Sequence, residues 1–172
     1  MLIGEKICLG PILLPDAPII FNWRNTASLM HLNGQYLPVS QRSFDEWFNH
    51  IGKDLSSVVF AIRRQGNLAL LGYIQITDIN PIFHTGVLGI IIGDALNRGK
   101  GYGQEALRLC IGFCWNELNL QRLSLLIAGE NEPAMRAYKK VGFEKEGVLR
   151  RAIYTDGAYA DGTIMGLLRP LS

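Results

Sequence analysis

Residues 85–118 read TGVLGIIIGDALNRGKGYGQEALRLCIGFCWNEL. The apolar run Thr85–Ile92 predicts a strand, and apolar residues at helical spacing from Tyr102 to Leu118 predict a helix. A glycine-rich turn at Asn97–Gly103 joins them. The first backbone N–H groups of a helix have no acceptor within it, the helix dipole favours negative charge there, and glycine allows close approach. This stretch therefore predicts an anion-binding turn between a strand and a helix.

Two well-known phosphate-binding loops fit this turn poorly. A Walker A loop has four residues between its first glycine and Gly-Lys, followed by Ser or Thr; here five residues separate Gly93 from Gly99, and Gly101 follows the lysine. A dinucleotide fingerprint fits Gly101–Ala106 as G-x-G-x-x-A, but its acidic partner is expected about 20 residues later. Glu130 comes 27 residues after the second glycine. A dinucleotide site and a plain glycine turn both remain open.

The remaining pattern places strands before and after this unit. Ser43 and Glu46 have the spacing of a capping box for a helix that carries Phe44 and Trp47 inward. The early strands form a meander and the later ones alternate with helices, which predicts one α/β (α+β) domain over residues 1–172 with a mixed sheet. The other predicted strands are Ile7–Leu14, Ser57–Arg63, Ala69–Asp78, Arg122–Ala128, Lys145–Tyr154 and Tyr159–Leu168, and the other predicted helices are Asp16–Leu32, Ser43–Ile51 and Asn131–Val141.

Composition excludes several classes of protein. The 172 residues are 48% apolar, enough for a sizeable core, and 17 Lys and Arg against 15 Asp and Glu give a net charge of +2. Without a basic cluster, bulk electrostatic binding of nucleic acid is not expected. No apolar run is long enough for a membrane span, and Glu5 and Lys6 interrupt any signal peptide, so we expect a cytoplasmic protein. Three cysteines do not form a disulfide framework, and Cys110 and Cys114 are expected to be buried packing rather than metal ligands.

A second motif lies downstream of the turn. Residues 131–143 read NEPAMRAYKKVGF. Asn131 is expected to cap a helix, Pro133 is tolerated in its first turn, and Tyr138 shares the face that points toward the sheet. Taken alone, Tyr138 is better explained as a core tyrosine whose hydroxyl finds a partner.

Together the two motifs resemble the GNAT acetyltransferases. Residues 131–143 resemble that family's N-x-x-A-x-x-x-Y-x-K-x-G-F segment, and Arg98-x-x-Gly101-x-Gly103 resembles its (Gln/Arg)-x-x-Gly-x-(Gly/Ala) loop. The resemblance extends from about Ile7 to Leu168. It implies a mixed, mostly antiparallel sheet of about seven strands flanked by about four helices.

Two narrower resemblances concern the substrate. EGVLRR at 146–151 and GAYAD at 157–161 are similar to the branch that holds ribosomal-protein N-terminal acetyltransferases. In the front half, WRN at 23–25 and GYIQITDIN at 72–80 are similar to acetyltransferases of nucleotide-linked amino sugars, of the pseudaminic-acid pathway type. The resemblance therefore implies transfer of an acetyl group to a primary amine, most closely that of a nucleotide-linked amino sugar.

The resemblance implies acetyl-CoA as the cofactor. Its pyrophosphate is expected on the backbone amides of the turn, and its pantetheine arm beside the open edge of the strand that ends at Ile92. The residues implied in cofactor binding are Leu88, Ile90, Ile91, Ile92, Arg98, Gly99, Lys100, Gly101, Tyr102, Gly103, Asn131, Ala134 and Tyr138.

The reaction implied is attack of a neutral amine on the thioester. A thiol pKa of about 8.5 and a tyrosine pKa of about 10 make Tyr138 a workable general acid. A backbone N–H near Ile90 is expected to hold the oxyanion. The base is less defined: Val87 stands where many relatives carry glutamate, and His84 is a candidate, with Asp78 and Glu130 as others. An amine less basic than an alkyl amine needs less help from a base, which fits an amino sugar.

The expected acceptor contacts come from the front half of the chain: Arg24, Met30, His31, Thr77 and His84. Arg24 is predicted to pair with a nucleotide phosphate, or else to form a surface ion pair. Acetylation of a protein N-terminus, acetylation of a polyamine or another small amine, and a catalytically silent CoA-binding module remain alternatives. We expect a monomer or homodimer, with no nucleic-acid, membrane or metal partner.

Overall fold

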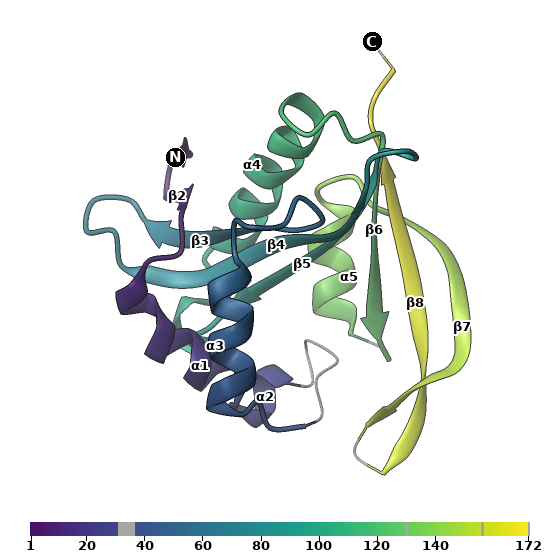
Figure 1. Cartoon of the computed structure of the whole chain (residues 1–172). Helices are drawn as coiled ribbons and strands as arrows, with labels where there is room; N and C mark the ends of the chain where they lie inside the picture. The colour runs from purple at the N-terminus through teal and green to yellow at the C-terminus, as the bar shows by residue number, and fades with distance from the viewer. Residues whose placement is uncertain (31–36, 130, 156, 172) are drawn as a thin grey trace.

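A computed structural model describes residues 1–30, 37–129, 131–155 and 157–171. Within these residues the strands form one eight-stranded sheet in the order β1-β2-β3-β4-β5-β6-β8-β7 (Figure 1). Only β5 and β6 pair in parallel, so the predicted mixed, mostly antiparallel sheet is confirmed. The strands are β1 Leu2–Ile3, β2 Ile7–Gly10, β3 Val58–Arg64, β4 Leu70–Asn80, β5 Thr85–Ile92, β6 Arg122–Ala128, β7 Glu144–Thr155 and β8 Ala158–Leu168.

Helices cover both faces of the sheet (Figure 1). The described α-helices are α1 Ala17–Arg24, α2 Ala27–Met30, α3 Gln41–His50, α4 Tyr102–Asn116 and α5 Glu132–Lys139. Helices α4 and α5 pack on one face around a core that includes Leu107 and Phe143, and α1 to α3 pack on the other around Ile20 and Phe44. Two apolar layers therefore enclose the middle of the sheet.

The predicted strand Ile7–Leu14 is too long, because β2 ends at Gly10. Asp16, where the predicted helix Asp16–Leu32 begins, makes no side-chain cap hydrogen bond to that helix. Its carboxylate is buried, accepts a hydrogen bond from the Leu13 N–H at 2.7 Å and pairs with the Arg63 guanidinium. Asp16 thus ties the start of the helical region to β3.

The predicted helix Asp16–Leu32 is interrupted at Asn25, and its last two residues lie outside the described part of the chain. The Asn25 side-chain amide donates to the carbonyls of Phe21 at 3.1 Å and Val39 at 3.2 Å, and its oxygen accepts from the Val39 N–H at 2.8 Å. An asparagine that bonds the backbone in this way competes with the helix ladder. Consequently α1 ends at Arg24 and α2 begins as a separate turn.

The capping residue of α3 also differs from the prediction. Ser40, not Ser43, caps the helix: its side chain accepts from the Ser43 N–H at 3.1 Å. The predicted inward face is confirmed, since Phe44 is buried and Trp47 is half-buried. Cys110 and Cys114 are buried in α4 as predicted, and a hydrogen bond between them together with burial raises the pKa of the Cys110 thiol.

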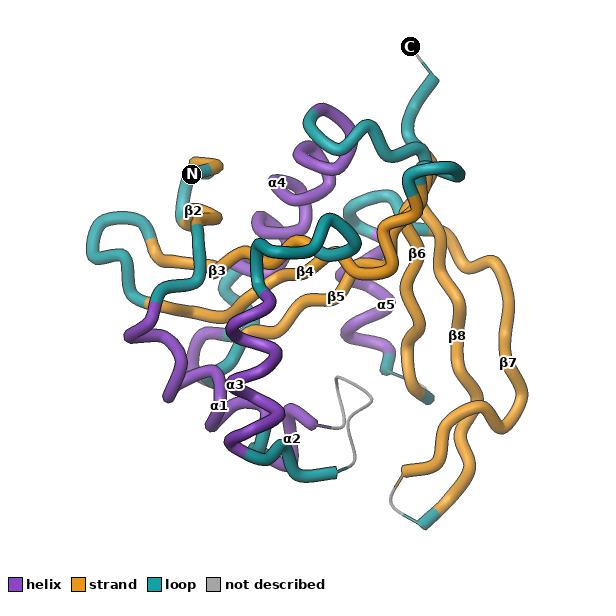
Figure 2. Tube along the Cα trace, viewed as in Figure 1, coloured by secondary structure: helices purple, strands orange, loops and turns teal. Residues whose placement is uncertain are grey.

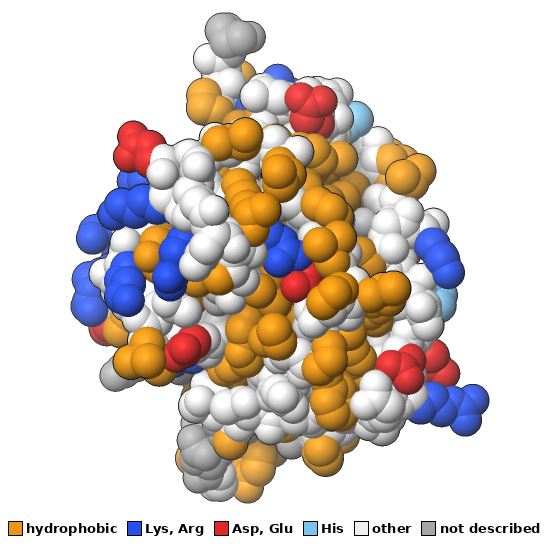
Figure 3. All heavy atoms as spheres, turned by 90° about the vertical axis from the view of Figure 1, so that its left-hand side faces the viewer, with side chains coloured by type: hydrophobic (Ala, Val, Ile, Leu, Met, Phe, Trp, Pro, Cys, Tyr) orange, Lys and Arg blue, Asp and Glu red, His pale blue; other side chains and the backbone are white. Residues whose placement is uncertain are grey.

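The edge of the sheet at β1 carries exposed apolar side chains. Met1 and Ile3 are 74% and 69% exposed, and Leu14, just before α1, is 80% exposed. Figure 3, which views this side, shows apolar side chains over much of the face. Three strands, β2 to β4, lie between this edge and β5, where the candidate site begins.

Candidate active site

Strands β5 and β6 separate along their length. They pair only where Thr85–Val87 meets Arg122–Ser124. Beyond this short ladder the two strands diverge, as Figures 1 and 2 show. A cavity of about 870 Å³ opens there, walled by Ile90–Ile92 of β5 and by Leu126–Ala128 of β6. The splayed strands therefore make the site.

The edge of β5 that faces this cavity is free to bind a ligand. The Gly93 N–H donates to the Leu71 carbonyl of β4 at 3.0 Å. Because backbone groups alternate in direction along a strand, the N–H and C=O of Ile90 and Ile92 face the opposite edge, toward β6. No β6 residue pairs with β5 beyond Val87. The N–H and C=O of Ile90 and the N–H of Ile92 are therefore available to an extended chain such as a pantetheine arm, whereas the Ile92 carbonyl accepts a hydrogen bond from Arg98.

The glycine-rich turn closes one end of the cavity. Gly99 and Gly101 have φ of 74° and 86°, which non-glycine residues rarely adopt. Gly101 is the N-cap of α4 and offers no side-chain cap; the first ladder bond of the helix runs from the Glu105 N–H to the Gly101 carbonyl at 3.0 Å. The backbone N–H groups of Tyr102, Gly103 and Gln104 come before this first ladder bond, so they have no acceptor within the helix. All three residues line the cavity. The predicted anion site therefore has its amides free.

Arg98 stabilises this turn rather than projecting freely into it. Its Nε donates to the Ile92 carbonyl at 3.3 Å and its Nη2 to the Gly93 carbonyl at 3.2 Å. These bonds fasten the turn to the end of β5. The guanidinium still adds positive charge beside the amides, which suits a phosphate ligand.

Helix α5 forms the third wall. Asn131 caps it as predicted, with its side-chain oxygen accepting from the Ala134 N–H at 3.2 Å, and Pro133 sits in the first turn. Asn131, Ala134 and Tyr138 all line the cavity. The N-cap and the i, i+4 spacing of Ala134 and Tyr138 place them on the side of α5 that faces the splayed strands.

Among the described residues of the cavity wall, Tyr138 and Tyr102 have a titratable hydroxyl. Burial raises the pKa of Tyr138 from 10.0 to about 12, so the phenol is a weaker acid than the sequence suggested. It keeps its proton throughout the physiological range. Full transfer of the phenol proton to a free thiolate, whose thiol has a pKa of about 8.5, is unfavourable by a pKa difference of about 3.5, or roughly 5 kcal/mol. A hydrogen bond donated to sulfur as the C–S bond breaks avoids most of that cost.

Most of the predicted cofactor residues come together in this cavity. Those that line it are Ile90, Ile91, Ile92, Arg98, Gly99, Gly101, Tyr102, Gly103, Asn131, Ala134 and Tyr138. Leu88 and Lys100 do not. The Leu88 side chain is buried in the core, and the Lys100 carbonyl accepts a hydrogen bond from Lys6 Nζ at 3.4 Å on the outside of the turn.

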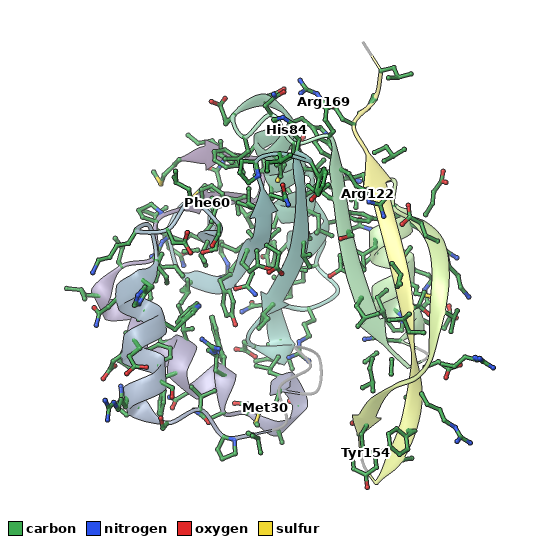
Figure 4. All side chains as sticks on the ribbon, turned by 45° about the vertical axis from the view of Figure 1, so that its right-hand side comes forward. Met30, Phe60, His84, Arg122, Tyr154 and Arg169 are labelled. Atoms are coloured by element: carbon green, nitrogen blue, oxygen red, sulfur yellow. The ribbon has the colours of Figure 1, made fainter. Side chains whose placement is uncertain are left out.

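His84 lies at the other end of β5. A strand rises about 3.3 Å per residue, so Thr85 and Ile92 are roughly 23 Å apart. The His84 carbonyl accepts from the Gln121 N–H at 2.7 Å, and Figure 4 shows His84 beside Arg169, far from Met30. The structure does not bring His84 to the cavity, so we leave it out of the proposed catalytic and acceptor-binding groups. The sequence indicates that His84 lies at the start of a strand, but it does not indicate which end of that strand faces the ligand.

The other expected acceptor residues have different positions. Thr77 pairs with Val87 near the β5–β6 junction and does not line the cavity. Met30 directly follows Leu29, the one described α2 residue in the cavity wall. His31 and Glu130 lie outside the described residues.

Arg24 lies on the α1–α3 side of the sheet and does not line the cavity. Its guanidinium stacks on the Trp47 ring, 4.5 Å from the centroid. Its Nε and Nη1 are buried and have no hydrogen-bond partner. Trp47 in turn packs against Tyr73, with centroids 6.1 Å apart, and Tyr73 pairs with the cavity residue Ile91. Unpaired buried donors of this kind are rare and favour an anionic ligand.

Some cavity residues were missed by the sequence analysis. They are Leu29, Asn97, Gln104, Leu107, Leu126, Ile127, Ala128, Gly129, Pro133, Arg136, Ala137, Lys140 and Thr155. Those on α5 could have been found from helical spacing, counted from Asn131. Those on β6 line the cavity because β5 and β6 diverge, and no short sequence pattern predicts that divergence. Among the described residues of the wall there is no carboxylate and no histidine.

Comparison with known proteins decides the family. The model of the acetyltransferase (GNAT) domain matches residues 6–144. The chain belongs to the GNAT acetyltransferase family. It is an acetyl-CoA-dependent N-acetyltransferase, and the fold and cofactor implied by its two motifs are confirmed. Within the described part of the chain, no helix is long and apolar enough to cross a membrane.

Similar proteins cover nearly the whole of this GNAT chain. A prophage-derived uncharacterized N-acetyltransferase, YokL of Bacillus subtilis, is 30% identical over 96% of this chain and 92% of its own. The spermidine N(1)-acetyltransferase of Escherichia coli K12 is 30% identical over 94% of this chain and 86% of its own. The structure of spermidine N-acetyltransferase from Vibrio cholerae in complex with CoA and spermine superposes with a TM-score of 0.89 at 25% identity, covering 96% of both chains.

Proposed function

We propose that this GNAT enzyme acetylates the primary amine of a small acceptor in the cavity between β5 and β6. The observation that carries the proposal is that free amides at the start of α4, an open edge of β5 and the Tyr138 side chain line one cavity. The first matches the pyrophosphate of CoA, the second its pantetheine arm, and the third its sulfur.

Acetyl-CoA supplies a reactive thioester. The amides of Tyr102–Gln104 hold the pyrophosphate, and the Ile90 N–H on the open edge of β5 stabilises the charge that develops on the carbonyl oxygen. As the acceptor nitrogen bonded to the acyl carbon and the C–S bond broke, Tyr138 would donate a hydrogen bond to the departing sulfur and keep its own proton. The nitrogen would release one proton to solvent, and the thiolate would take up one proton from solvent.

The absence of a carboxylate or histidine from the described cavity wall bears on the acceptor. An alkyl amine of pKa about 10.4 is neutral at pH 7 in less than about 0.1% of molecules. Because no described residue of the wall can take this proton, we infer that solvent supplies the neutral form. Turnover is then expected to rise with pH, and acceptors with a lower amine pKa are expected to react faster.

A polyamine is the acceptor class that the comparisons support. The E. coli relative is a spermidine N(1)-acetyltransferase. The V. cholerae relative is a spermidine N-acetyltransferase whose structure contains CoA and spermine. A nucleotide-linked amino sugar is the second candidate, and the unpaired nitrogens of Arg24 favour it, because a buried cation suits an acceptor that carries negative charge. Spermidine, spermine, a nucleotide-linked amino sugar and a short peptide with a free N-terminus are therefore the acceptors to compare.

Binding and turnover together test the proposal. Gly103 is a suitable site for a blocking variant, because a Cβ there makes only ordinary contacts with Ile92 and Ile90, so Gly103→Glu is expected to fold. Its carboxylate would occupy the anion site. We expect calorimetry to show CoA binding that is lost in Gly103→Glu and kept in Gly112→Glu, a control at an open position of the same helix. Preference for NAD would contradict the proposal.

A catalytically silent module would bind acetyl-CoA yet acetylate none of the four acceptors and ignore Tyr138→Phe. The assembly and location of the enzyme also stay predictions: a monomer or homodimer in the cytoplasm. One solved form of the V. cholerae spermidine N-acetyltransferase is dodecameric, so sedimentation analysis should include higher assemblies.

A further inference from the structure

Strand β6 presents an exposed leucine to the cavity. Successive side chains of a strand point to opposite faces of the sheet. Leu123, Leu125 and Ile127 are buried in the core that α4 and α5 cover. Leu126 therefore points to the opposite face, where it is 51% exposed and lines the cavity. About half of an aliphatic side chain is thus open to whatever molecule occupies the cavity.

Helices α1 to α3 do not extend over this part of the sheet. Among the described residues, the apolar cluster beneath these helices takes its strand residues from β3, β4 and β5, and none from β6, β7 or β8. In Figure 1, α1 to α3 lie over the left half of the sheet, and β6, β8 and β7 lie to the right of them. Within the described part of the chain, the face of β6 that carries Leu126 is therefore uncovered directly beside the splay.

Leu126 is surrounded by other apolar side chains on this face. Its cross-strand partner on β8 is Ile164. A Cβ added to Gly162 would lie 2.9 Å from Leu126 Cδ1 and 3.4 Å from Ile153 Cδ1, so both side chains lie over that glycine. Leu149, the partner of Gly162 on β7, is 46% exposed. We call Leu126, Ile164, Ile153 and Leu149 the Leu126 strip.

The described charges of the cavity wall lie away from the Leu126 strip. They are Arg98, Arg136 and Lys140. Arg98 is bonded to carbonyls at the end of β5, and the other two belong to α5 and the residue that follows it, on the face of the sheet that α4 also covers. Arg122 and Glu146, where β5 and β6 still pair, neutralise each other. A chain that lies on the strip therefore meets carbon atoms.

The strip is on the side of the sheet that the cofactor leaves to the acceptor. The proposed contacts with the pyrophosphate and the sulfur come from the start of α4 and from Tyr138 of α5, on the α4–α5 face. Leu29 and Ile91 belong to the cluster beneath α1 to α3, on the opposite face, and line the cavity across the splay from Leu126. An acceptor that approaches the thioester from that face passes between aliphatic side chains.

We propose that Leu126 determines acceptor specificity by packing against the carbon chain that carries the reacting amine. The inference rests on the proposed function, because it places the acceptor in the same cavity. Contact between two aliphatic groups removes apolar surface from water, whereas a charged or hydroxyl group held against Leu126 would lose hydration without gaining a hydrogen bond. The enzyme is therefore selective for primary amines on an unbranched aliphatic chain, a class that includes the ends of polyamines.

A chain-length series of acceptors tests the proposal. The kcat/KM of n-alkylamines from propylamine to hexylamine would be measured at saturating acetyl-CoA, with spermidine as a further acceptor. The amine pKa is almost constant along the series, so a trend reports contacts with the chain. Full burial of a methylene gives about fourfold, and a strip open to solvent covers only part of the chain, so we expect a rise of about twofold per methylene and about eightfold in total.

Three variants complete the experiment. Leu126→Gln keeps the size of the side chain but removes its apolar end, and it should reduce the total rise to less than about twofold while the Kd of CoA is unchanged. Leu126→Met, which stays apolar, should retain the trend. Leu168→Gln is the matched control, because Leu168 is 63% exposed on β8 and does not line the cavity.

A flat series in the wild type, or a full trend in Leu126→Gln, would overturn the inference. Equal losses for every alkylamine in Leu126→Gln, together with weaker CoA binding, would overturn it as well, because they would assign Leu126 to the fold. A flat series beside measurable turnover of spermidine removes the inference alone. If the wild type acetylated none of these amines and did not bind CoA, the proposed function would fail with it.

Discussion

The ring of Tyr138 meets the ring of Phe143 nearly edge-on, with centroids 5.6 Å apart and an angle of 69° between the planes. Phe143 is 1% exposed and belongs to the core formed with α4. Edge-to-face contact of this kind fixes a ring without using its hydroxyl. The phenol of Tyr138 is thus positioned by packing and keeps its proton for a ligand.

Tyr138→Phe is expected to lower kcat at least tenfold while the Kd of CoA stays within twofold. The variant removes only the hydroxyl, so packing on Phe143 and the folded state are retained. Steady-state kinetics and calorimetry measure the two quantities. Tyr154→Phe is the matched control, because Tyr154 is 56% exposed in the β7–β8 hairpin. Unchanged turnover in Tyr138→Phe would exclude the phenol from catalysis.

The pH dependence of turnover gives a second, independent measure. Burial raises the pKa of Tyr138 to about 12, and the protonated form is the active one. Its loss therefore begins well above pH 10. We expect kcat/KM to rise from pH 6 to pH 9.5 as the acceptor amine loses its proton, with no descending limb below pH 10. A descending limb near pH 8 to 9 that disappears in Tyr138→Phe would contradict this assignment.

Local rules were sufficient for the turn and for α5. The positive φ of Gly99 and Gly101, the free N-cap of α4 and the cap formed by Asn131 all follow from short stretches of sequence. The break at Asn25 does not, since the partner that holds its side chain, Val39, is 14 residues away. Hydrogen bonds to distant backbone are invisible to helical periodicity.

The cavity itself depends on strand order. Thr85–Ile92 and Arg122–Ala128 were both predicted as strands, but only the sheet shows that they pair over three residues and then diverge. The same strand order places His84 at the end of β5 away from the cavity and Lys140 in the cavity wall. A sequence can indicate that a residue starts a strand. Which end of that strand faces the ligand depends on how it pairs with strands distant in the sequence.

Arg24→Gln is expected to separate the two acceptor classes. Removing a buried cation should lower kcat/KM for a nucleotide-linked amino sugar at least tenfold, and should leave that for spermidine unchanged or higher, because a polycation gains nothing from Arg24. Assays of both acceptors at saturating acetyl-CoA measure the effect.

The control for this variant is Arg42→Gln, an exposed arginine on α3 that pairs only with Glu46 among the described residues. Equal losses for both acceptors in Arg24→Gln, accompanied by a lower melting temperature, would assign the arginine to stacking on Trp47 instead.

A salt bridge on the far strands predicts a pH-dependent stability. Arg122 of β6 and Glu146 of β7 form two hydrogen bonds, one of 2.7 Å from Nη1 to Oε1, and reach each other over Gly166 of β8. The hydrogen bond from Arg122 lowers the pKa of Glu146 below its usual range. A lowered folded-state pKa stabilises the protein above the unfolded pKa of about 4.3, and this contribution is lost as the pH falls through the folded value.

Glu146→Gln is therefore expected to lower the free energy of unfolding at pH 7 and to match the wild type more closely at pH 3. Both side chains are about one-third exposed, so solvent screening limits the effect to about 0.5 kcal/mol. Gly166→Ala should cost at least as much, because its Cβ would displace the Glu146 carboxylate. Urea unfolding at the two pH values measures both, with Glu144→Gln on the same strand as the control. A loss in Glu146→Gln that is equal at pH 3 and pH 7 would mean that the pair contributes no charge-dependent stability.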